Sequence, residues 1–236
     1  MSFLTAEWRK LAIANYIVKP DILLPYLPYK TELDVWQGNC YVSLVGFMFA
    51  NVRLLVVPIP FHTNFEEVNL RFYVRYKDGN EWKRGVVFIK EIVPLHAVTF
   101  IANTIYKENY QTMPMRHLWQ QTNHIQRVQY DWKYTHQWQS IQIDADLQSQ
   151  PIAEGSEVEF ITEHYWGYAQ INAQQTYQYQ VTHPRWEHYP VKNYQITTNF
   201  GTVYGKQFAF LNQLAPHSVM LAEGSKITVE SISKIN

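Results

Sequence analysis

The stretch FEEVNLRFYVR, residues 65–75, constrains the fold more than any other part of the chain. Apolar and polar side chains alternate along it, as in an extended strand, where successive side chains point to opposite faces. One face carries Val68, Leu70, Phe72 and Val74, and the other carries Glu67, Asn69, Arg71, Tyr73 and Arg75. The polar face therefore meets either water or the inside of a pocket.

This polar face differs from an ordinary solvated one, where Lys, Glu, Thr and Ser occur in interchangeable order. It combines a carboxylate, an amide and two guanidinium groups, which can hold a bound carboxylate or one another. If the groups are buried, they have to satisfy each other's hydrogen bonds. The pattern alone fits an ion-paired outer strand equally well, so both interpretations stay open.

Further strands are predicted where β-branched and aromatic residues dominate between Gly, Pro and Asp-Gly turn signals. The predicted strands cover residues 40–49, 68–76, 85–92, 96–103, 124–134, 137–146, 157–169, 176–184 and 225–235. Residues 77–80, KDGN, form a turn between the second and third of them. Sequential strands joined by short turns predict an antiparallel sheet.

Helices are predicted mainly before the first strand. Residues 6–16 carry apolar side chains at helical spacing after Thr5, a residue suited to cap a helix. A second short helix is predicted over residues 22–27, and residues 206–213 could form another. Residues 107–121 lose the alternation and suit a connecting segment or a short helix. The predicted fold class is α+β, with one domain over residues 1–236 built around a strongly curved antiparallel sheet.

Composition excludes several classes of protein. Hydrophobic residues make up 47% of the 236 residues and charged residues 17%, so a sizeable core is available. The 20 basic and 20 acidic residues balance, which argues against nucleic acid as a partner. The single cysteine, Cys40, fits a reducing compartment, and neither a signal peptide nor a membrane helix is recognisable. We therefore expect a cytoplasmic protein without a membrane partner.

Known catalytic and cofactor motifs are missing. The sequence has no dinucleotide-binding or phosphate-binding glycine pattern and no Gly-x-Ser-x-Gly elbow, so no cofactor is predicted. Among the nine histidines, only Glu163, His164 and His183 form a plausible metal-binding group, and that depends on the strand register. Polar-network or interface histidines are the favoured interpretation.

Aromatic residues are abundant, with 17 Tyr, 12 Phe and 8 Trp. Such rings suit half-buried strands and also line ligand cavities. The tyrosine-rich stretch YWGYAQINAQQTYQYQ, residues 165–180, could instead expose rings for contact with another protein. This leaves a cavity and an interaction surface as alternatives.

Several stretches together resemble the uncharacterised bacterial family known as domain of unknown function 2071. They are PIPFHTNFEEVNLRFYVR, RGVVFIKEIVP, YKENYQTMPMRH, FITEHYWGY and VTHPRW. The likeness extends from Trp8 to the final AEGSKITV. The family is similar in fold to acetoacetate decarboxylase. This resemblance implies mostly antiparallel β structure in a closed or cone-shaped barrel, with peripheral helices and an internal cavity.

The resemblance implies that the polar face of residues 65–75 points into the barrel. The decarboxylase has an aromatic-x-Glu step whose glutamate faces the cavity, and FEE at residues 65–67 is similar to it, which implies this position for Glu67. Asn69, Arg71 and Tyr73 would then also face inward, while Val68 and Leu70 would pack outward beneath helices.

The chain departs from the decarboxylase in its nucleophile. Schiff-base chemistry needs a lysine whose pKa is lowered by burial and by a second lysine, and no Lys-Lys pair occurs here. Gln111 and Thr112 occupy the corresponding positions. Lys107 lies nearby, but its neighbour Glu108 would raise the lysine pKa. The sequence therefore argues against Schiff-base decarboxylation.

These observations predict that the cavity binds a small organic acid or carbonyl compound, or acts on it without a Schiff base. Arg71 would clamp a carboxylate and Glu67 could act as acid or base. The candidate ligand-binding residues are Glu67, Asn69, Arg71, Tyr73, Tyr106, Glu108 and His164. The alternatives are a non-catalytic protein-interaction module and, second, a metal-dependent hydrolase that uses His164 and His183. Homo-oligomerisation stays open.

Overall fold

Seven strands form a closed ring in the computed structural model, which describes residues 2–55 and 57–236. The ring strands, in order, are β16 (Ser218–Glu230), β1 (Ser2–Val18), β3 (Cys40–Leu54), β5 (Phe65–Asp78), β6 (Glu81–Val93), β12 (Trp166–Asn172) and β13 (Gln175–Thr182). Neighbours pair antiparallel except β6 and β12, which pair in parallel. Pairing of β13 with β16 closes the ring.

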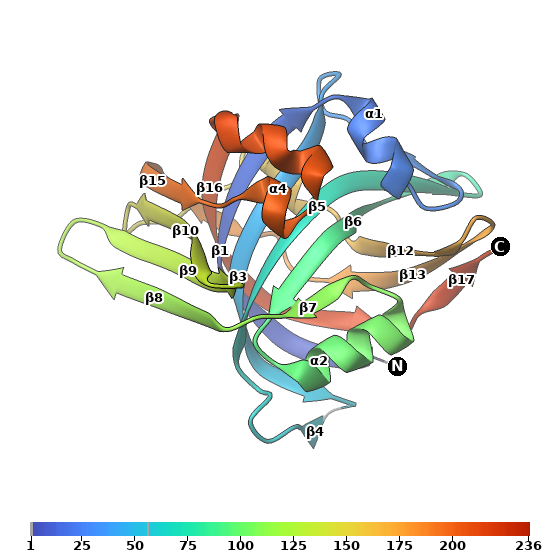
Figure 1. Ribbon diagram of the computed structural model, residues 1–236, viewed down its shortest axis with the longest axis horizontal. Coiled ribbons are helices and arrows are strands. Elements are labelled where there is room, and N and C mark those ends of the chain that lie inside the picture. The colour runs from blue at the N-terminus through green and yellow to red at the C-terminus, as the bar shows by residue number, and fades with distance from the viewer. Residues whose placement is uncertain (1, 56) are drawn as a thin grey trace.

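Short strands extend the ring at its edges. They are β2 (Thr31–Leu33) on β5, β4 (Val57–Pro58) on β3, β7 (Tyr110–Thr112) on β6, β14 (Glu187–Tyr189) on β16, β11 (Gln150–Pro151) on β14, and β17 (Ser233–Ile235) on β13. The prediction of mostly antiparallel β structure with few helices is therefore confirmed (Figure 1).

A second, four-stranded sheet packs on the outside of the ring. Its order is β15 (Val191–Thr197), β10 (Gln137–Ala145), β9 (Gln126–Tyr134) and β8 (Met115–Gln121). The two sheets approach closely at Gly46, because a Cβ atom there would lie 2.9 Å from Cδ2 of Tyr130. The missing side chain lets the Tyr130 ring pack directly against the ring strand β3.

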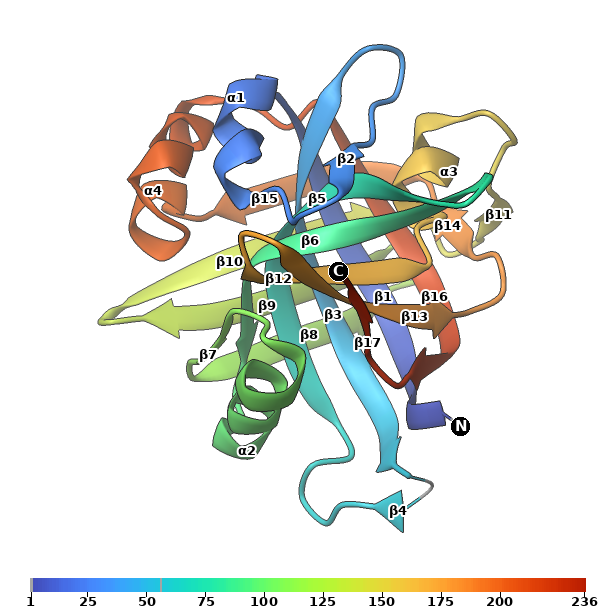
Figure 2. The ribbon, with the colours of Figure 1, turned by 90° about the vertical axis from the view of Figure 1, so that its right-hand side faces the viewer.

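Short helices lie at the two ends of the ring (Figures 1 and 2). At the upper end in Figure 1 are α1 (Pro20–Leu23), η1 (Leu24–Tyr26), α4 (Phe200–Val203) and η3 (Lys206–Gln213). At the lower end are α2 (His96–Ile101) and the π-helical turn η2 (Ala102–Tyr106). A further helix, α3 (Glu157–Thr162), lies near β11 and β14 in Figure 2. No helix in the described ranges is long and apolar enough to span a membrane.

Strand β5 is buried on both faces, which explains its alternating sequence. Its apolar residues Val68, Leu70, Phe72 and Val74 are all fully buried in the core that joins the ring to the second sheet and to α4 and η3. Its polar residues Glu67, Asn69, Arg71 and Tyr73 face the interior of the ring and are buried as well, whereas Arg75 is only partly buried. The predicted outward packing of Val68 and Leu70 is confirmed, with a sheet as well as helices covering them.

The interior of the ring is only partly filled. Towards α3, a core that includes Tyr41, Tyr73, Phe160, Ile161 and Met220 fills the interior. The rest of the interior, towards α2 and β4, contains a cavity. The fold thus provides one packed half and one open half inside the same ring.

The predicted first helix, residues 6–16, is wrong: these residues belong to strand β1. Strand β1 pairs with β3 on one side and with β16 on the other, along most of its length. Every residue from 11 to 16 is buried, because the interior of the ring covers one face and the outer sheet covers the other. The apparent helical spacing arose from a strand that is apolar on both faces.

Three other predictions also need correction. Residues 96–103 form α2 and part of η2 rather than a strand. Residues 107–121 contain β7 and β8 rather than a helix. Residues 157–162, predicted as the start of a strand over 157–169, form α3 instead. Ser156 caps this helix, because its Oγ accepts a hydrogen bond from the backbone N–H of Glu159 at 3.2 Å. The short helices predicted near residues 22–27 and 206–213 are confirmed.

Candidate functional site

A cavity of about 300 Å³ occupies the open half of the ring interior. Its walls are mostly apolar and aromatic, and include Trp8, Phe47, Phe49, Phe65, Phe88 and Trp186. Residues of α2 and of the segment after β4 line it as well, and Figure 1 draws these two elements at the same end of the ring. The polar residues of the lining are therefore few and stand out.

Three residues of β5 place polar groups in this wall. Glu67, Asn69 and Arg71 all line the cavity, and their side chains are buried. Their spacing of two residues puts them on one face of the strand, as the sequence predicts. The polar row therefore faces the interior cavity and not the solvent outside the ring.

Arg71 is 7% exposed, and its charge acts on Glu67 by lowering the pKa of that carboxyl group. Within residues 2–55 and 57–236, no carboxylate lies within ion-pair distance of the guanidinium, and Nε has no hydrogen-bond partner. The Tyr73 ring lies 5.7 Å from Cζ. A buried charge without a partner is costly, so this arrangement suits a group that receives an anionic ligand.

His164 lies on the same side of the cavity as Arg71. The positive charge of Arg71 is close enough to lower the pKa of His164. Asp34 accepts a hydrogen bond from Nε2 of His164 at 3.1 Å and another from Nε of Arg84 at 2.6 Å. Burial is the main cause that lowers the pKa of His164 to about 4. The imidazole is therefore neutral at pH 7, with its proton on Nε2, and Nδ1 has no partner among the described residues. We call Arg71, His164 and Asp34 the basic end.

Three carboxyl groups lie on the other side. Glu67 accepts a hydrogen bond from Nδ2 of Asn69 at 2.9 Å and from the hydroxyl of Tyr110 at 3.0 Å. Glu108 accepts one from the hydroxyl of Tyr179 at 2.7 Å. Glu91, paired with Asn69 across β5 and β6, is 2% exposed and its Oε2 has no partner in the described part of the chain. We call Glu67, Glu91, Glu108, Tyr110 and Tyr179 the acidic end.

Burial raises the pKa of each carboxyl group at the acidic end. It raises the pKa of Glu67 to about 7, although Asn69, Tyr110 and Arg71 act in the opposite direction. It raises the pKa of Glu108 to about 8. The pKa of Glu91 is well above its usual value, because of burial first and then of its two acidic neighbours. Glu67 and Glu108 therefore exchange protons near neutral pH, as acid–base groups do.

A glycine allows one of the tyrosines to reach its carboxylate. Gly167 pairs with Tyr179 across β12 and β13, and a Cβ atom there would lie 2.1 Å from Cζ of Tyr179. The Tyr179 ring also meets the ring of Tyr106 edge-on, at 5.2 Å between centroids. Gly167 and Tyr106 thus position the hydroxyl that holds Glu108.

The structure brings six of the seven candidate residues together around the cavity: Glu67, Asn69, Arg71, Tyr106, Glu108 and His164. Tyr73 is the exception. It lies in the packed half of the ring, where its hydroxyl is 2.7 Å from Oγ of Ser43 and its ring is 4.8 Å from that of His164. Its place next to Arg71 and His164 makes it a support for the basic end.

Sequence reasoning missed Asp34, Glu91, Tyr110 and Tyr179. Glu91 offered a signal, because it is a carboxylate in an otherwise apolar strand, within the stretch RGVVFIKEIVP. Tyr110 and Tyr179 could not be told apart from the other tyrosines. Asp34 lies far from His164 in sequence, and only the folded chain brings the two together.

The structure does not assemble the hypothesised metal group. Glu163 accepts a hydrogen bond from the Tyr165 hydroxyl, His164 is bonded to Asp34, and the ring of His183 stacks on Trp186 at 4.2 Å between centroids. Within the described ranges, no group of three His, Cys, Asp or Glu side chains could hold a metal ion. The metal-dependent hydrolase therefore loses the site on which it was based.

The lysines near the cavity in sequence do not reach it. Lys107 is exposed, and Lys90 donates a hydrogen bond to the carbonyl of Val203, on the outer side of β6. Among the residues that the structure describes, no lysine lines the cavity. This agrees with the sequence argument against a lysine nucleophile.

The tyrosine-rich hairpin at residues 165–180 is not an exposed aromatic surface. It forms β12 and β13 of the ring, where Tyr168 and Tyr179 are buried and the remaining rings, Tyr165, Trp166 and Tyr177, are partly buried. The structure therefore does not support an interaction surface at this hairpin.

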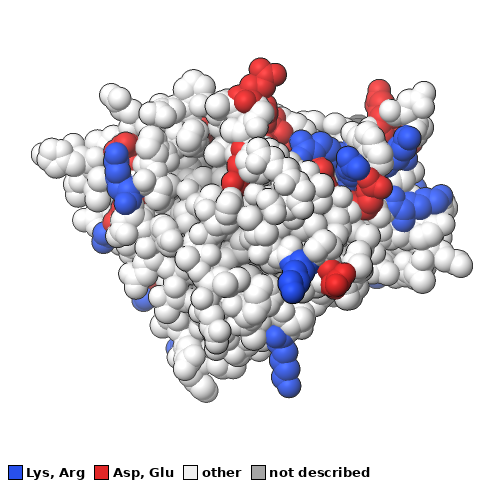
Figure 3. Space-filling view, turned by 90° about the horizontal axis from the view of Figure 1, so that it is seen from above, with Lys and Arg blue, Asp and Glu red and all other residues white. Residues whose placement is uncertain are grey.

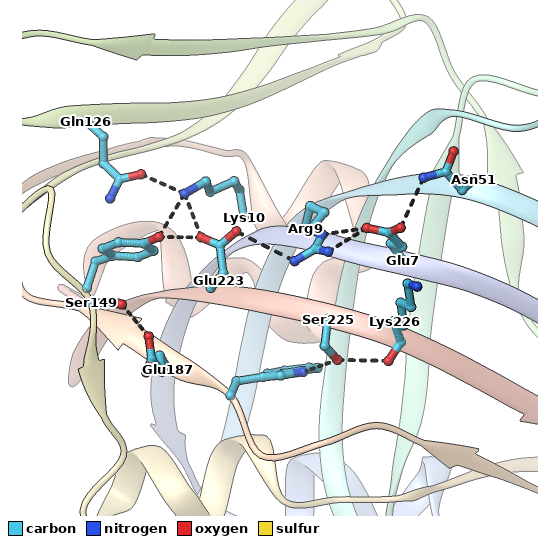
Figure 4. A network of polar contacts seen from close by, with 12 residues as sticks. Glu7, Arg9, Lys10, Asn51, Gln126, Ser149, Glu187, Glu223, Ser225 and Lys226 are labelled. Carbon is cyan, nitrogen blue, oxygen red and sulfur yellow. Dashed lines mark hydrogen bonds and ion pairs between the residues drawn. The ribbon is translucent and has the colours of Figure 1, made fainter.

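The outer surface carries charges that are paired. Lys10 donates hydrogen bonds to Gln126 at 3.0 Å, Tyr189 at 3.1 Å and Glu223 at 2.7 Å (Figure 4). Arg9 donates to Glu7 at 2.8 Å. We call Lys10, Arg9, Glu7, Gln126, Tyr189 and Glu223 the outer network. On the face seen in Figure 3, charges of both signs lie in small scattered groups on a mostly uncharged surface.

Comparison with known proteins agrees with this fold. The model of the DUF2071 family, described as uncharacterized conserved proteins, matches residues 5–226. The uncharacterized protein YqjF of Bacillus subtilis is 37% identical over 82 residues, which are 34% of this chain and 32% of that relative. The chain therefore spans about a third of the length of this relative.

Solved structures with acetoacetate decarboxylase-like folds are similar over the whole chain. Acetoacetate decarboxylase from Legionella pneumophila has a TM-score of 0.67 at 12% identity, over 99% of this chain and 87% of that one. The enduracididine biosynthesis enzyme MppR, solved with pyruvate, has a TM-score of 0.66 at 11% identity, over 100% and 91% of the two chains. Identities this low show a common fold alone. The chain belongs to the DUF2071 family and has an acetoacetate decarboxylase-like fold.

Proposed function

We propose that this member of the DUF2071 family binds a small organic acid or carbonyl compound in the cavity, with Arg71 holding the carboxylate. The observation that carries the proposal is the buried guanidinium of Arg71, which lines the cavity without an ion-pair partner. Arg presents a planar fork of donors that matches a carboxylate with two parallel hydrogen bonds. A bound acid would supply the missing counter-charge.

The size of the cavity supports a small ligand. At about 300 Å³ it lies at the lower end of the range for ligand pockets. Its aromatic and aliphatic walls suit a short apolar body, and its guanidinium and carboxyl groups belong to the two ends. The preferred ligand therefore has a short carbon chain with a carboxylate at one end.

Two observations support binding without a covalent imine. The cavity lining contains no lysine within the described ranges. The enzyme MppR, which is similar in fold, has been solved with pyruvate, so a protein of this fold can bind a small oxo acid. Incubation with pyruvate and borohydride should leave the mass of this protein unchanged, and a labelled Lys107 would contradict the proposal.

The proposal is tested by isothermal titration calorimetry, which measures the affinity of the protein for short acids. The acids are pyruvate, 2-oxopentanoate, valerate and 5-aminovalerate. We expect at least one acid to bind the wild-type chain, and Arg71→Met to weaken that binding by about 100-fold, because a charge-assisted bidentate pair is lost. Arg75→Met is the matched control, since Arg75 lies on the same strand but pairs with Glu32 outside the cavity. Equal affinity in both variants, or no binding of any acid, would contradict the proposal.

A second candidate function is proton transfer to and from a carbon next to a carbonyl group. The observation that favours it is Glu67, which lines the cavity and whose pKa is raised to about 7. Glu67 would remove a proton from that carbon and return it, which exchanges the hydrogen with solvent. Proton NMR of 2-oxopentanoate in D₂O would detect this exchange at C3, and we expect Glu67→Gln to abolish it. Exchange at the same rate in both proteins would reject this function.

A further inference from the structure

The tyrosine hydroxyls and the asparagine amide nitrogen at the acidic end each already donate a hydrogen bond. The hydroxyls of Tyr110 and Tyr179 donate to Glu67 and Glu108, and Nδ2 of Asn69 donates to Glu67. The bond made by Nδ2 also fixes the direction of the Asn69 amide, so its Oδ1 remains an acceptor. When its carboxyl groups are ionised, what this end lacks is therefore a donor and not an acceptor.

Two acceptor atoms remain without a donor. Oδ1 of Asn69 and Oε2 of Glu91 have no partner in the described part of the chain, and both side chains are 98% buried or more. Asn69 and Glu91 are directly paired across β5 and β6, so the two acceptors belong to neighbouring positions of one wall. Buried acceptors without donors are rare in folded proteins and often mark a place for a ligand.

We propose that the ligand carries an ammonium group as well as a carboxylate, with the ammonium held between Asn69 and Glu91 and the carboxylate held by Arg71. This inference rests on the proposed function, because it places a second group of the same ligand. An ammonium group offers three N–H donors, whereas a hydroxyl offers one. It therefore satisfies both free acceptors at once.

Charge and ring placement favour a cation at this end. The cavity is lined by three glutamates and, within the described ranges, by one arginine, Arg71, which lowers the pKa of Glu67. The rings of Tyr106, Tyr110 and Tyr179 also line this part of the cavity. Carboxylates together with aromatic rings form a favourable environment for an ammonium group.

The spacing of the residues defines the class of amino acid. Asn69 and Arg71 are two residues apart on one strand face, which is roughly 7 Å along an extended chain. An α-amino acid carries its two charged groups on one carbon atom, and these are too close to reach both ends. A short ω-amino acid, with a flexible carbon chain between its amine and its carboxylate, spans the distance.

Isothermal titration with 5-aminovalerate, valerate and glutarate tests this inference. Valerate lacks the amine, and glutarate replaces it with a second carboxylate. We expect 5-aminovalerate to bind at least about tenfold more tightly than valerate, and glutarate to bind more weakly than valerate. Glu91→Gln should remove the advantage of 5-aminovalerate over valerate, whereas Glu81→Gln, at an exposed residue of the same strand, should leave that advantage unchanged.

A second readout uses the wild-type protein alone. Since ammonium binding favours the ionised carboxylates, 5-aminovalerate should release protons on binding at pH 7, and titration in buffers of different ionisation enthalpy measures this release. Valerate affinity equal to that of 5-aminovalerate, or binding without proton release, would overturn the inference. If valerate affinity still falls in Arg71→Met, the proposed function holds without this inference. If no acid binds, the proposed function and the inference both fail.

Discussion

The outer network and the cavity wall are both built from charged side chains on ring strands, yet they differ in how those charges are satisfied. In the outer network, Lys10 has three hydrogen-bond partners and Arg9 is paired with Glu7. In the cavity, Arg71 has no ion-pair partner among the described residues, and Glu91 has an unpartnered oxygen. The first arrangement is complete without another molecule, and the second is not. This difference separates charges that support the fold from charges available to a ligand.

The largest expected effect is opposite behaviour of Arg71→Met and Lys10→Met. Arg71→Met should weaken binding of the best acid by about 100-fold and leave the free energy of unfolding unchanged or slightly raised, because an unpaired buried charge is removed. Lys10→Met should lower the free energy of unfolding by about 1 to 2 kcal/mol and leave acid binding unchanged, because it takes a donor from Glu223 and its neighbours. Isothermal titration calorimetry of both variants measures acid affinity, and urea denaturation measures the free energy of unfolding. If both variants lose mainly stability, the comparison fails.

A close contact at the acidic end gives the next effect. Gly167→Ala places a Cβ atom where the ring of Tyr179 lies, so we expect a loss of about 1 to 3 kcal/mol in the free energy of unfolding. It should also weaken 5-aminovalerate binding, since Tyr179 no longer holds Glu108 in place. Gly155→Ala, at an exposed turn, is a control for the substitution, although its positive φ adds a small strain. Unchanged stability of the Gly167 variant would show that Tyr179 is free to move.

The two regions should also respond differently to pH. The pKa of Glu67 is raised to about 7 in the folded chain, so the folded state keeps a proton that the unfolded state releases near pH 4.5. The stabilisation from Glu67 is therefore complete below pH 4.5 and is lost as pH rises through 7. His164, with its pKa lowered to about 4, acts in the opposite direction below pH 6.5.

Denaturation at pH 6.5 and pH 8 avoids the contribution of His164. Over this window we expect the wild-type chain to lose about 1 kcal/mol more than Glu67→Gln does. In the outer network, Arg9 and Asn51 hold the pKa of Glu7 below its usual value, so Glu7→Gln should leave the loss over this window unchanged. Equal pH dependence in wild type and Glu67→Gln would show that Glu67 is not buried as described.

The sequence predicted the central strand better than its surroundings. The alternation in residues 65–75 placed Glu67, Asn69 and Arg71 on one face because β5 is a regular strand, and the resemblance to acetoacetate decarboxylase gave that face its inward direction. The same alternation could not show that Tyr73 lies outside the cavity. The position of Tyr73 depends on which half of the ring interior is filled by α3. The first helix was wrong because β1 is apolar on both faces, and strand pairing at long range outweighs local spacing.

The residues that the sequence missed share one property. Asp34, Glu91, Tyr110 and Tyr179 contribute to the site through partners on other strands, such as Asp34 with His164 and Tyr179 with Glu108. Their roles depend on register, on a parallel pairing of β7 with β6, and on the space left by Gly167. A single sequence carries no direct signal for such pairings.

The most direct test of the account is a crystal structure of the protein with 5-bromovalerate, a short acid whose bromine is located by its anomalous signal. The account predicts the carboxylate within hydrogen-bond distance of the Arg71 guanidinium, and the bromine inside the ring, on the side of Asn69 and Glu91. An empty cavity, or an acid bound at the outer network with Arg71 still unpaired, would contradict it.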